Sequence, residues 1–301
     1  MGSSGGGVLN ASAHTYKLSR LKVEAMQMNK KRLDSPAVRR VLPVALLAAV
    51  FMAYVPMRHA PALMAAVTTR ELPVYNVDTE EKVLSISFDA AWGRANTEGI
   101  LDILDQYDVK TTFFLVGFWA EKHPDLVAEL VARGHEIGNH SATHPHMAQL
   151  SQAQIREELR KCSDLVKSIT GKPTTLFRPP YGEYNDSVVR VSREEGYECV
   201  QWNVDSLDWK NLGTENMVRQ CTKSVNPGDI VLFHNDSKYI LEALPQILEY
   251  YTQAGYRIIP VSQLLLQGET WLDHTGKQHL CTPTPAPQGQ TSAAAVGHKP
   301  G

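Results

Sequence analysis

Two histidines four positions apart, His140 and His144, are the side chains of this sequence that most directly suggest chemistry. If this segment forms a helical turn, residues four apart lie on the same side of it. Two neutral imidazoles placed in this way can share a divalent metal ion, most often zinc. The same pair could instead be surface or capping histidines before Pro145, so the spacing alone leaves both interpretations open.

Asp89 and Arg178 form a second candidate pair, although 89 positions separate them. Asp89 follows an apolar run, and a carboxylate at a strand end can bind metal or take a proton from metal-bound water. The alternative for Asp89 is a helix N-cap. Arg178 offers a bidentate partner that would keep this carboxylate ionised, and an ordinary surface ion pair is its alternative.

His234 ends the apolar run 229–234 and could donate a proton to a leaving amine or alcohol. Either Asp205 or Asp208 could lie behind its other ring nitrogen and tune its basicity. In isolation, a histidine at the end of an apolar run could also be a satisfied core residue. Three aromatic residues beside the candidate positions, Trp92, Trp202 and Trp209, could stack on sugar rings or belong to the core.

Alternating predicted strands and helices position these residues. The strands are predicted at 83–88, 111–116, 135–140, 176–178, 197–204, 229–234 and 256–260. The helices are predicted at 97–107, 118–133, 151–170, 186–195, 214–225 and 239–254. This alternation predicts an α/β protein with a parallel sheet, either open or closed into a barrel. Because functional residues gather at the carboxyl ends of parallel strands, we expect the candidates to meet at one rim.

The remaining segments suggest export from the cytoplasm. Residues 1–40 are predicted to be a disordered, basic N-terminal region. The uncharged run 41–57 follows that basic cluster and is predicted to be a transmembrane or signal segment, with the basic side in the cytoplasm. Residues 58–79 are predicted to be a linker, residues 80–268 the folded domain and residues 269–301 a disordered tail rich in Pro, Ala and Gly towards its end. The domain is therefore expected outside the membrane, or secreted if the segment is cleaved.

Composition and missing motifs exclude several functions. The net charge is −2, and no basic stripe interleaved with aromatic residues is present, so no nucleic-acid partner is expected. The sequence has no G-x-S-x-G nucleophile motif, no phosphate-binding P-loop and no Gly-rich dinucleotide fingerprint. The four cysteines form no C-x-x-C pair, which argues against a structural zinc site.

The ordered run SFDAAWG, HSATH, RPPYGEYN, DSLDW and VLFH resembles the polysaccharide deacetylase family, also called carbohydrate esterase family four. The resemblance covers roughly residues 80–265. It is closest to the sporulation-type branch of Gram-positive spore formers, which has a similar FDxxWG motif and a short N-terminal membrane segment. The implied fold is a distorted (β/α) barrel of about seven parallel strands, preceded here by the membrane or signal segment.

The resemblance also implies a role for each matching residue. By this resemblance Asp89 is the catalytic base, which Arg178 positions, and His234 is the general acid, which Asp205 tunes. The resemblance makes His140 and His144 the metal ligands. It also implies that the backbone N–H of Tyr181 helps to form the oxyanion site and that Trp209 and Leu232 line the acetyl pocket. The implied cofactor is a divalent metal, zinc or alternatively cobalt or another ion.

The sequence departs from the family pattern at one position that bears on the metal. The usual first motif has two consecutive aspartates, the second of which is a metal ligand, and Ala90 stands in that place here. The implied protein ligand set therefore falls from three side chains to two, which should weaken metal binding.

The resemblance implies a hydrolase of amide bonds other than peptide bonds, with an N-acetylated polysaccharide as its partner. We expect metal-dependent deacetylation of a cell-wall polysaccharide. Export favours peptidoglycan as the substrate, and the resemblance implies sporulation as the setting. One alternative is a glycan-binding or scaffold protein of the cell envelope that lost its metal with Ala90. Another is a chitooligosaccharide deacetylase or an esterase acting on O-acetyl groups, because the acid and base residues would be the same.

Overall fold

The computed structural model describes residues 70–281. The predicted N-terminal region 1–40 and the predicted membrane or signal segment 41–57 lie outside the described residues, as does the end of the predicted tail, 282–301. Within residues 70–281, no helix combines the length and the apolar character needed to cross a bilayer.

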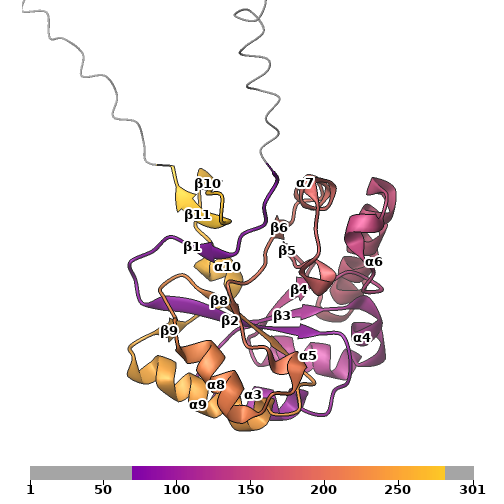
Figure 1. Cartoon of the computed structure of the whole chain (residues 1–301). Helices are drawn as coiled ribbons and strands as arrows, with labels where there is room; N and C mark the ends of the chain where they lie inside the picture. The colour runs from indigo at the N-terminus through magenta and orange to yellow at the C-terminus, as the bar shows by residue number, and fades with distance from the viewer. Residues whose placement is uncertain (1–69, 282–301) are drawn as a thin grey trace, which may run out of the picture. The chain divides into compact units, whose positions relative to one another are not determined.

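Strands and helices alternate along most of this region (Figure 1). The strands are β1 (Asn76–Val77), β2 (Val83–Ala90), β3 (Thr112–Leu115), β4 (Glu136–Asn139), β5 (Leu176–Phe177), β6 (Glu198–Cys199), β7 (Val204–Asp205), β8 (Ile230–His234), β9 (Arg257–Ile258), β10 (Thr270–Leu272) and β11 (Lys277–Leu280). The α-helices are α3 (Thr97–Gln106), α4 (Gly117–Lys122), α5 (Pro124–Ala132), α6 (Gln152–Thr170), α7 (Asp186–Glu194), α8 (Thr214–Thr222), α9 (Ile240–Gln253) and α10 (Val261–Leu264). Three short 3-10 turns, η1 (Met147–Gln149), η2 (Pro180–Gly182) and η3 (Asp208–Lys210), lie in the loops.

The main sheet is a half-barrel of parallel strands, as the α/β pattern predicted. Its strands follow the order β6-β5-β4-β3-β2-β8-β7, and β9 pairs with the start of β2. All pairings in this sheet are parallel, so the carboxyl ends of the strands meet at one rim. The arrangement fits a distorted (β/α) barrel of seven strands in one path.

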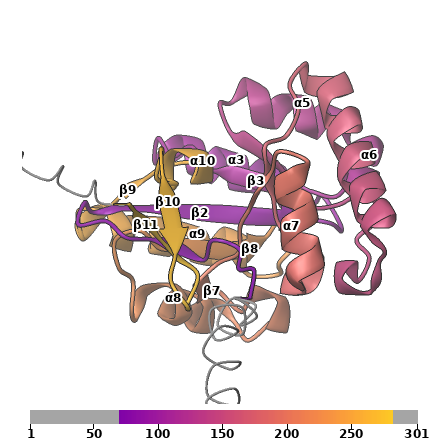
Figure 2. The same cartoon turned by 90° about the horizontal axis from the view of Figure 1, so that it is seen from above.

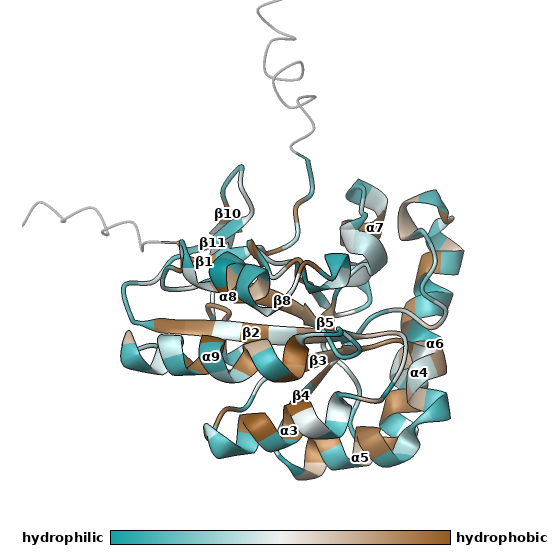
Figure 3. Ribbon diagram, turned by 60° about the horizontal axis from the view of Figure 1, so that its bottom comes forward, coloured by the Kyte–Doolittle hydropathy of each residue, from teal (hydrophilic) through white to brown (hydrophobic). Residues whose placement is uncertain are grey.

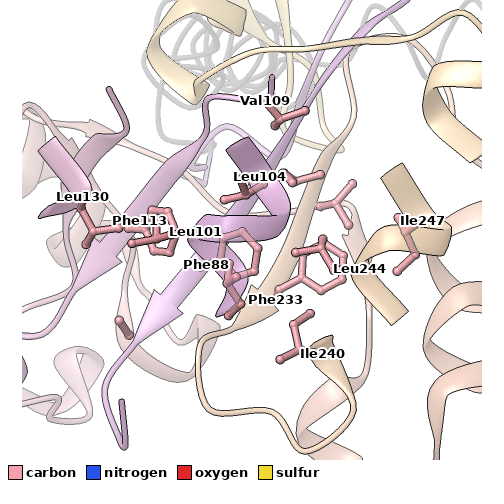
Figure 4. Close-up of a cluster of buried hydrophobic side chains, with 14 of the residues drawn as sticks. Phe88, Leu101, Leu104, Val109, Phe113, Leu130, Phe233, Ile240, Leu244 and Ile247 are labelled. Atoms are coloured by element: carbon pink, nitrogen blue, oxygen red, sulfur yellow. The ribbon is translucent and has the colours of Figure 1, made fainter. Parts of the chain in front are cut away.

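The central strand β2 carries apolar core side chains on one face and mostly polar side chains on the other. Leu84, Ile86 and Phe88 alternate along it and belong to the core cluster beneath the helices. Phe88 stacks on Phe113 of β3 at 4.9 Å and on Phe233 of β8 at 5.5 Å between ring centroids. Figure 4 shows Phe88 and Phe233 between Leu101 and Leu104 of α3 and Ile240, Leu244 and Ile247 of α9, with Phe113 beside Leu101. In Figure 3 the apolar faces of the helices turn towards the sheet.

The opposite side chains of β2 lead to the rim. Ser85 and Ser87 are fully buried, and their hydroxyls donate to the carbonyls of Ile259 and Val231. Because side chains alternate along a strand, Asp89 shares this face and stands at its carboxyl end. The alternation along β2 therefore places the Asp89 carboxylate at the rim of the half-barrel, and pairing with β3 and β8 holds its backbone on both sides.

The segment at residues 74–77 closes the open side of the sheet. The Val74 N–H donates to the Cys199 carbonyl and the Val74 carbonyl accepts from Gln201 N–H, at 2.8 and 2.7 Å. The Val77 N–H donates to the Gly228 carbonyl at 2.9 Å, just before β8 begins. The first described residues therefore join the β6 side of the sheet to the β8 side.

The predicted strand 197–204 is wrong as a single element. It forms two short strands, β6 and β7, which lie at opposite ends of the sheet path. The predicted helix 118–133 is likewise two helices, α4 and α5, because Pro124 cannot continue the first one and begins the second.

The predicted boundaries of the domain, residues 80–268, are too narrow. Val74 and Val77, assigned to the linker, are buried. Residues 270–280, assigned to the disordered tail, form the hairpin β10–β11, and β11 pairs in parallel with β1. Figure 2 shows β10, β11 and α10 on the side of the domain away from α6. The strands are too short for their alternation to be recognised in the sequence.

A substitution at Gly228 tests whether the contact with residues 74–77 stabilises the fold. It has φ +82°, and a Cβ atom there would overlap the carbonyl oxygen of Val77. We predict that Gly228→Ala lowers the free energy of unfolding by about 3 kcal/mol, because both the backbone strain and the overlap must be relieved. Urea unfolding followed by circular dichroism measures the change.

Gly171→Ala is the matched control for this substitution. Gly171 has a similar φ of +77°, but a Cβ there would meet nothing within 4 Å. We expect this variant to lose only about 1 kcal/mol, the cost of the left-handed backbone conformation alone. Equal losses in the two variants would contradict the closure.

Candidate active site

The rim of the half-barrel contains a cavity of about 590 Å³. Eight of the predicted site residues line it: Asp89, His140, His144, Tyr181, Asp205, Trp209, Leu232 and His234. They come from strands and loops spread over 146 positions, so the parallel topology brings the candidates together as predicted. Arg178 is fully buried and contacts the cavity through Asp89.

Asp89 and Arg178 form a buried ion pair. Arg178 Nη1 donates to Asp89 Oδ1 at 2.8 Å, and Nη2 donates to the Gln201 carbonyl at 3.1 Å. The guanidinium also lies 4.1 Å from the ring centroid of Phe114. Burial alone would raise the pKa of Asp89, but the charge and hydrogen bond of Arg178, together with smaller contributions from His140 and His234, hold the pKa below its usual value. Asp89 is therefore ionised at neutral pH.

His140 and His144 come together, but not on a helical turn as the spacing predicted. They follow β4 in an irregular loop, and their ring centroids are 5.0 Å apart. Ser141 and His144 adopt left-handed backbone angles, with φ 69° and 57°. The His144 N–H donates to the Ser141 hydroxyl at 2.9 Å, which stabilises this turn. The pair is therefore built by strained loop backbone rather than by helical periodicity.

Both histidines are suited to binding a metal as neutral imidazoles. His140 Nδ1 lies 2.7 Å from the Arg178 carbonyl, so it carries the proton and leaves Nε2 as an acceptor. That Nε2 lies 3.5 Å from Asp89 Oδ2. Burial lowers the pKa of His140, and burial together with His140 lowers the pKa of His144 to about 4. His144 Nδ1 is buried without a hydrogen-bond partner among the described residues.

His234 is paired with Asp208, which corrects the prediction of Asp205. Asp208 Oδ1 lies 2.8 Å from His234 Nδ1, and Oδ2 accepts the His234 N–H at 2.7 Å. Asp205 instead accepts the Leu207 N–H at 2.8 Å and lines the cavity. The reason is local: β7 ends at Asp205, and Leu207 adopts a left-handed φ of 55°, which turns the chain back so that Asp208 reaches the histidine.

The surroundings of His234 favour its protonated form. Burial alone would lower its pKa, but the hydrogen bond and charge of Asp208, with smaller contributions from Asp89 and Asp205, raise the pKa to about 9. Asp89 and His234 are also register partners in the β2–β8 ladder. An ionised carboxylate and a protonated imidazole therefore stand side by side on adjacent strands at neutral pH.

The three predicted substrate-binding residues form parts of the cavity wall. Tyr181 lies in η2 with a left-handed φ of 60° and packs edge-on against His144 at 4.4 Å between centroids. Trp209 is 55% exposed, whereas Leu232 on β8 is only 2% exposed. The cavity thus has an apolar, buried floor at Leu232 and aromatic side chains nearer solvent.

The two histidines are suitable ligands for a divalent cation, but the family's usual ligand set has three side chains. His140 and His144 offer unengaged nitrogens, and the buried, unpartnered His144 Nδ1 supports this assignment. Ala90 is buried in the core cluster and does not line the cavity. Across residues 70–281, no three His, Cys, Asp or Glu side chains cluster closely enough to hold a metal ion. The identity of the metal stays a prediction.

Residues 76–200 match the sequence profile of the family described as polysaccharide deacetylase. The chain is 36% identical over 196 residues to a peptidoglycan-N-acetylglucosamine deacetylase of Bacillus cereus, an alignment that covers 64% of this chain and 92% of the relative. The chain belongs to the polysaccharide deacetylase family. Its predicted resemblance to that family, one of amide-bond hydrolases, is therefore confirmed.

Two of the solved structures that are similar to the chain illustrate the range of the family. Bacillus subtilis PdaA, a family 4 carbohydrate esterase, has a TM-score of 0.61 and 31% identity, covering 64% of this chain and 84% of that one. A pseudoenzyme of the same family from Bacillus anthracis has a TM-score of 0.62 and 31% identity, covering 64% and 69%. The family thus includes both deacetylases and a member described as a pseudoenzyme.

Some functional candidates were missed or left open by the sequence. The motif DSLDW offered two aspartates, and only the turn at Leu207 distinguishes them. Asp236 also lines the cavity, two residues after His234, and burial raises its pKa. Its position in the same loop as His234 was the available signal.

We predict that Asp208→Asn lowers the pKa of His234 from its wild-type value of about 9. The substitution removes the charge that contributes most to opposing the effect of burial on this pKa. An NMR titration of the His234 ring carbons measures this pKa.

Asp205→Asn is the matched control, because Asp205 lines the same cavity without a hydrogen bond to the ring. We expect it to leave the pKa of His234 within about one unit of the wild-type value. If the pKa of His234 fell further in Asp205→Asn than in Asp208→Asn, Asp205 would be the residue that tunes His234, as the resemblance implied.

Proposed function

We propose that this protein removes acetyl groups from an N-acetylated cell-wall polysaccharide, releasing acetate and a free amino sugar. The observation that carries the proposal is the pairing of ionised Asp89 with protonated His234 at the floor of one cavity. Arg178 stabilises the first charge and Asp208 the second. Amide hydrolysis needs both a group that accepts a proton and a group that donates one, and these residues supply the two.

Peptidoglycan is the substrate we propose. Both the Bacillus cereus relative and PdaA carry names that specify peptidoglycan deacetylation. The uncharged segment 41–57 follows a basic cluster, which is typical of a membrane anchor or signal sequence. We therefore propose that the domain acts outside the cytoplasmic membrane, during sporulation, where peptidoglycan is the N-acetylated polymer.

The proposed reaction uses the charge states of the site directly. Asp89 Oδ2, which lies 3.5 Å from His140 Nε2 while Oδ1 is held by Arg178, accepts the proton of the attacking water. His234, with a pKa of about 9, retains its proton at neutral pH and donates it to the nitrogen that departs as the amine. The Tyr181 N–H donates a hydrogen bond to the carbonyl oxygen as negative charge develops there. Leu232 contacts the acetyl methyl group at the apolar floor.

A divalent cation, which His140 and His144 would hold, would polarise the acetyl carbonyl and lower the pKa of a bound water molecule. With Ala90 in place of a third ligand, we expect its affinity to be lower than in a three-ligand site. Added metal should then be needed for activity in purified protein.

A second function is favoured by Ala90 itself. The protein could bind glycan without hydrolysing it, as an envelope scaffold that lost its metal. The likeness to the Bacillus anthracis pseudoenzyme supports this alternative. The intact set of Asp89, Arg178, Asp208 and His234 favours the enzyme, because binding alone does not require an acid and a base in paired charge states.

The direct test is acetate release from purified peptidoglycan by the full chain, with zinc or cobalt added or with a chelator. We expect release with metal and none with chelator. His234→Ala should slow release about 100-fold or more, because a general acid contributes that much. Acetate is measured enzymatically in the supernatant.

His140→Ala and His146→Ala form the control pair. His140 faces the cavity, whereas His146 is half exposed and pairs with Glu183 at 2.7 Å. We expect His140→Ala to lose activity and His146→Ala to retain most of it. Wild-type release no greater than that of His140→Ala would exclude the deacetylase and leave the glycan-binding alternative.

A further inference from the structure

Three large aromatic side chains around the cavity are exposed to solvent. Trp92 is 58% exposed, and Tyr181 and Trp209 are each 55% exposed. Large aromatic side chains are usually well buried, so a group of them at one cavity indicates a surface that binds an apolar face of a ligand. The faces of sugar rings are such surfaces.

Trp92 has the most open ring of the three. Tyr181 stacks nearly parallel on His146, with 4.6 Å between centroids and an angle of 18°. The Lys210 ammonium lies 4.8 Å from the Trp209 ring. The neighbours of Trp92 instead meet it tilted or edge-on: Phe118 at 5.1 Å and 38°, and His144 at 6.0 Å and 66°. These neighbours hold the indole without stacking parallel on its face.

The loop that carries Trp92 is fixed by hydrogen bonds. The carbonyl of Gly93 accepts from Trp119 Nε1 at 2.6 Å and from Asn235 Nδ2 at 3.2 Å. Gly93 itself has φ 58°, a conformation that costs glycine little. A ligand that stacks on Trp92 therefore does not have to order the loop, which favours binding.

We propose that Trp92 is a stacking platform for the sugar ring next to the one that carries the reacting acetyl group. The inference rests on the proposed function and adds a second position at which the site binds the glycan strand. The acetyl group must reach Asp89 and Leu232, which are 5% and 2% exposed at the floor. Trp92 lines the same cavity and is far more exposed, so it lies where the next sugar of the glycan strand would stack.

The test compares binding of peptidoglycan glycan strands, freed of peptides and separated by length, to the full chain by calorimetry. We expect Trp92→Ala to bind eight-sugar strands about two- to tenfold more weakly than the wild type, the range expected for one lost aromatic contact. Binding of the disaccharide should change less than twofold. Trp92→Phe should recover part of the affinity for long strands, which a merely structural role in the loop would not explain.

Trp271→Ala is the matched control. Trp271 is 51% exposed on β10 and does not line the cavity, so its loss should leave binding of both lengths unchanged. Equal affinity of Trp92→Ala and wild type for long strands overturns the proposal but leaves the deacetylase function standing. Equal weakening for both lengths also overturns it, because Trp92 would then act at the reacting sugar. A wild type that binds no strand and releases no acetate overturns both.

Discussion

The buried ion pair between Asp89 and Arg178 is the interaction on which the rest of the site depends. Removing two charges from water is costly, and only a close pair with further hydrogen bonds offsets that cost. Here Arg178 is fully buried, donates to Asp89 and to a backbone carbonyl, and packs on Phe114. The negative charge so retained contributes to keeping the neighbouring His234 protonated, together with Asp208. Four groups of alternating charge therefore lie at one rim.

Strained backbone positions the parts of the site that the sheet does not. Of the six non-glycine residues with positive φ among residues 70–281, all but Asp108 lie in three loops at the cavity. Ser141 and His144 bring two histidines together, Tyr181 lies in the left-handed region itself, and Leu207 directs Asp208 to His234. Each such residue costs about 1–3 kcal/mol, so the surrounding packing must stabilise these loops.

The alternation of strands and helices, and the motifs at the strand ends, were sufficient to predict the α/β fold and the meeting of Asp89, His140, His144 and His234. Local patterns locate the strands, and a parallel arrangement brings their carboxyl ends to one rim. The partner of His234 could not be predicted, because Asp208 reaches the ring only through the turn at Leu207. The hairpin at residues 270–280 was missed because its strands are short and β11 pairs with β1, which is far away in the sequence.

The central claim is that His234 acts as a protonated acid beside an ionised base. The pH dependence of kcat/KM for acetate release from peptidoglycan tests it most directly, because this ratio reports the ionisation of the free enzyme. We predict that activity persists above pH 8 and falls as His234 loses its proton near pH 9. In Asp208→Asn the alkaline limb should move to lower pH while the acid limb, set by Asp89, stays in place. An alkaline limb that does not move in Asp208→Asn would contradict the account.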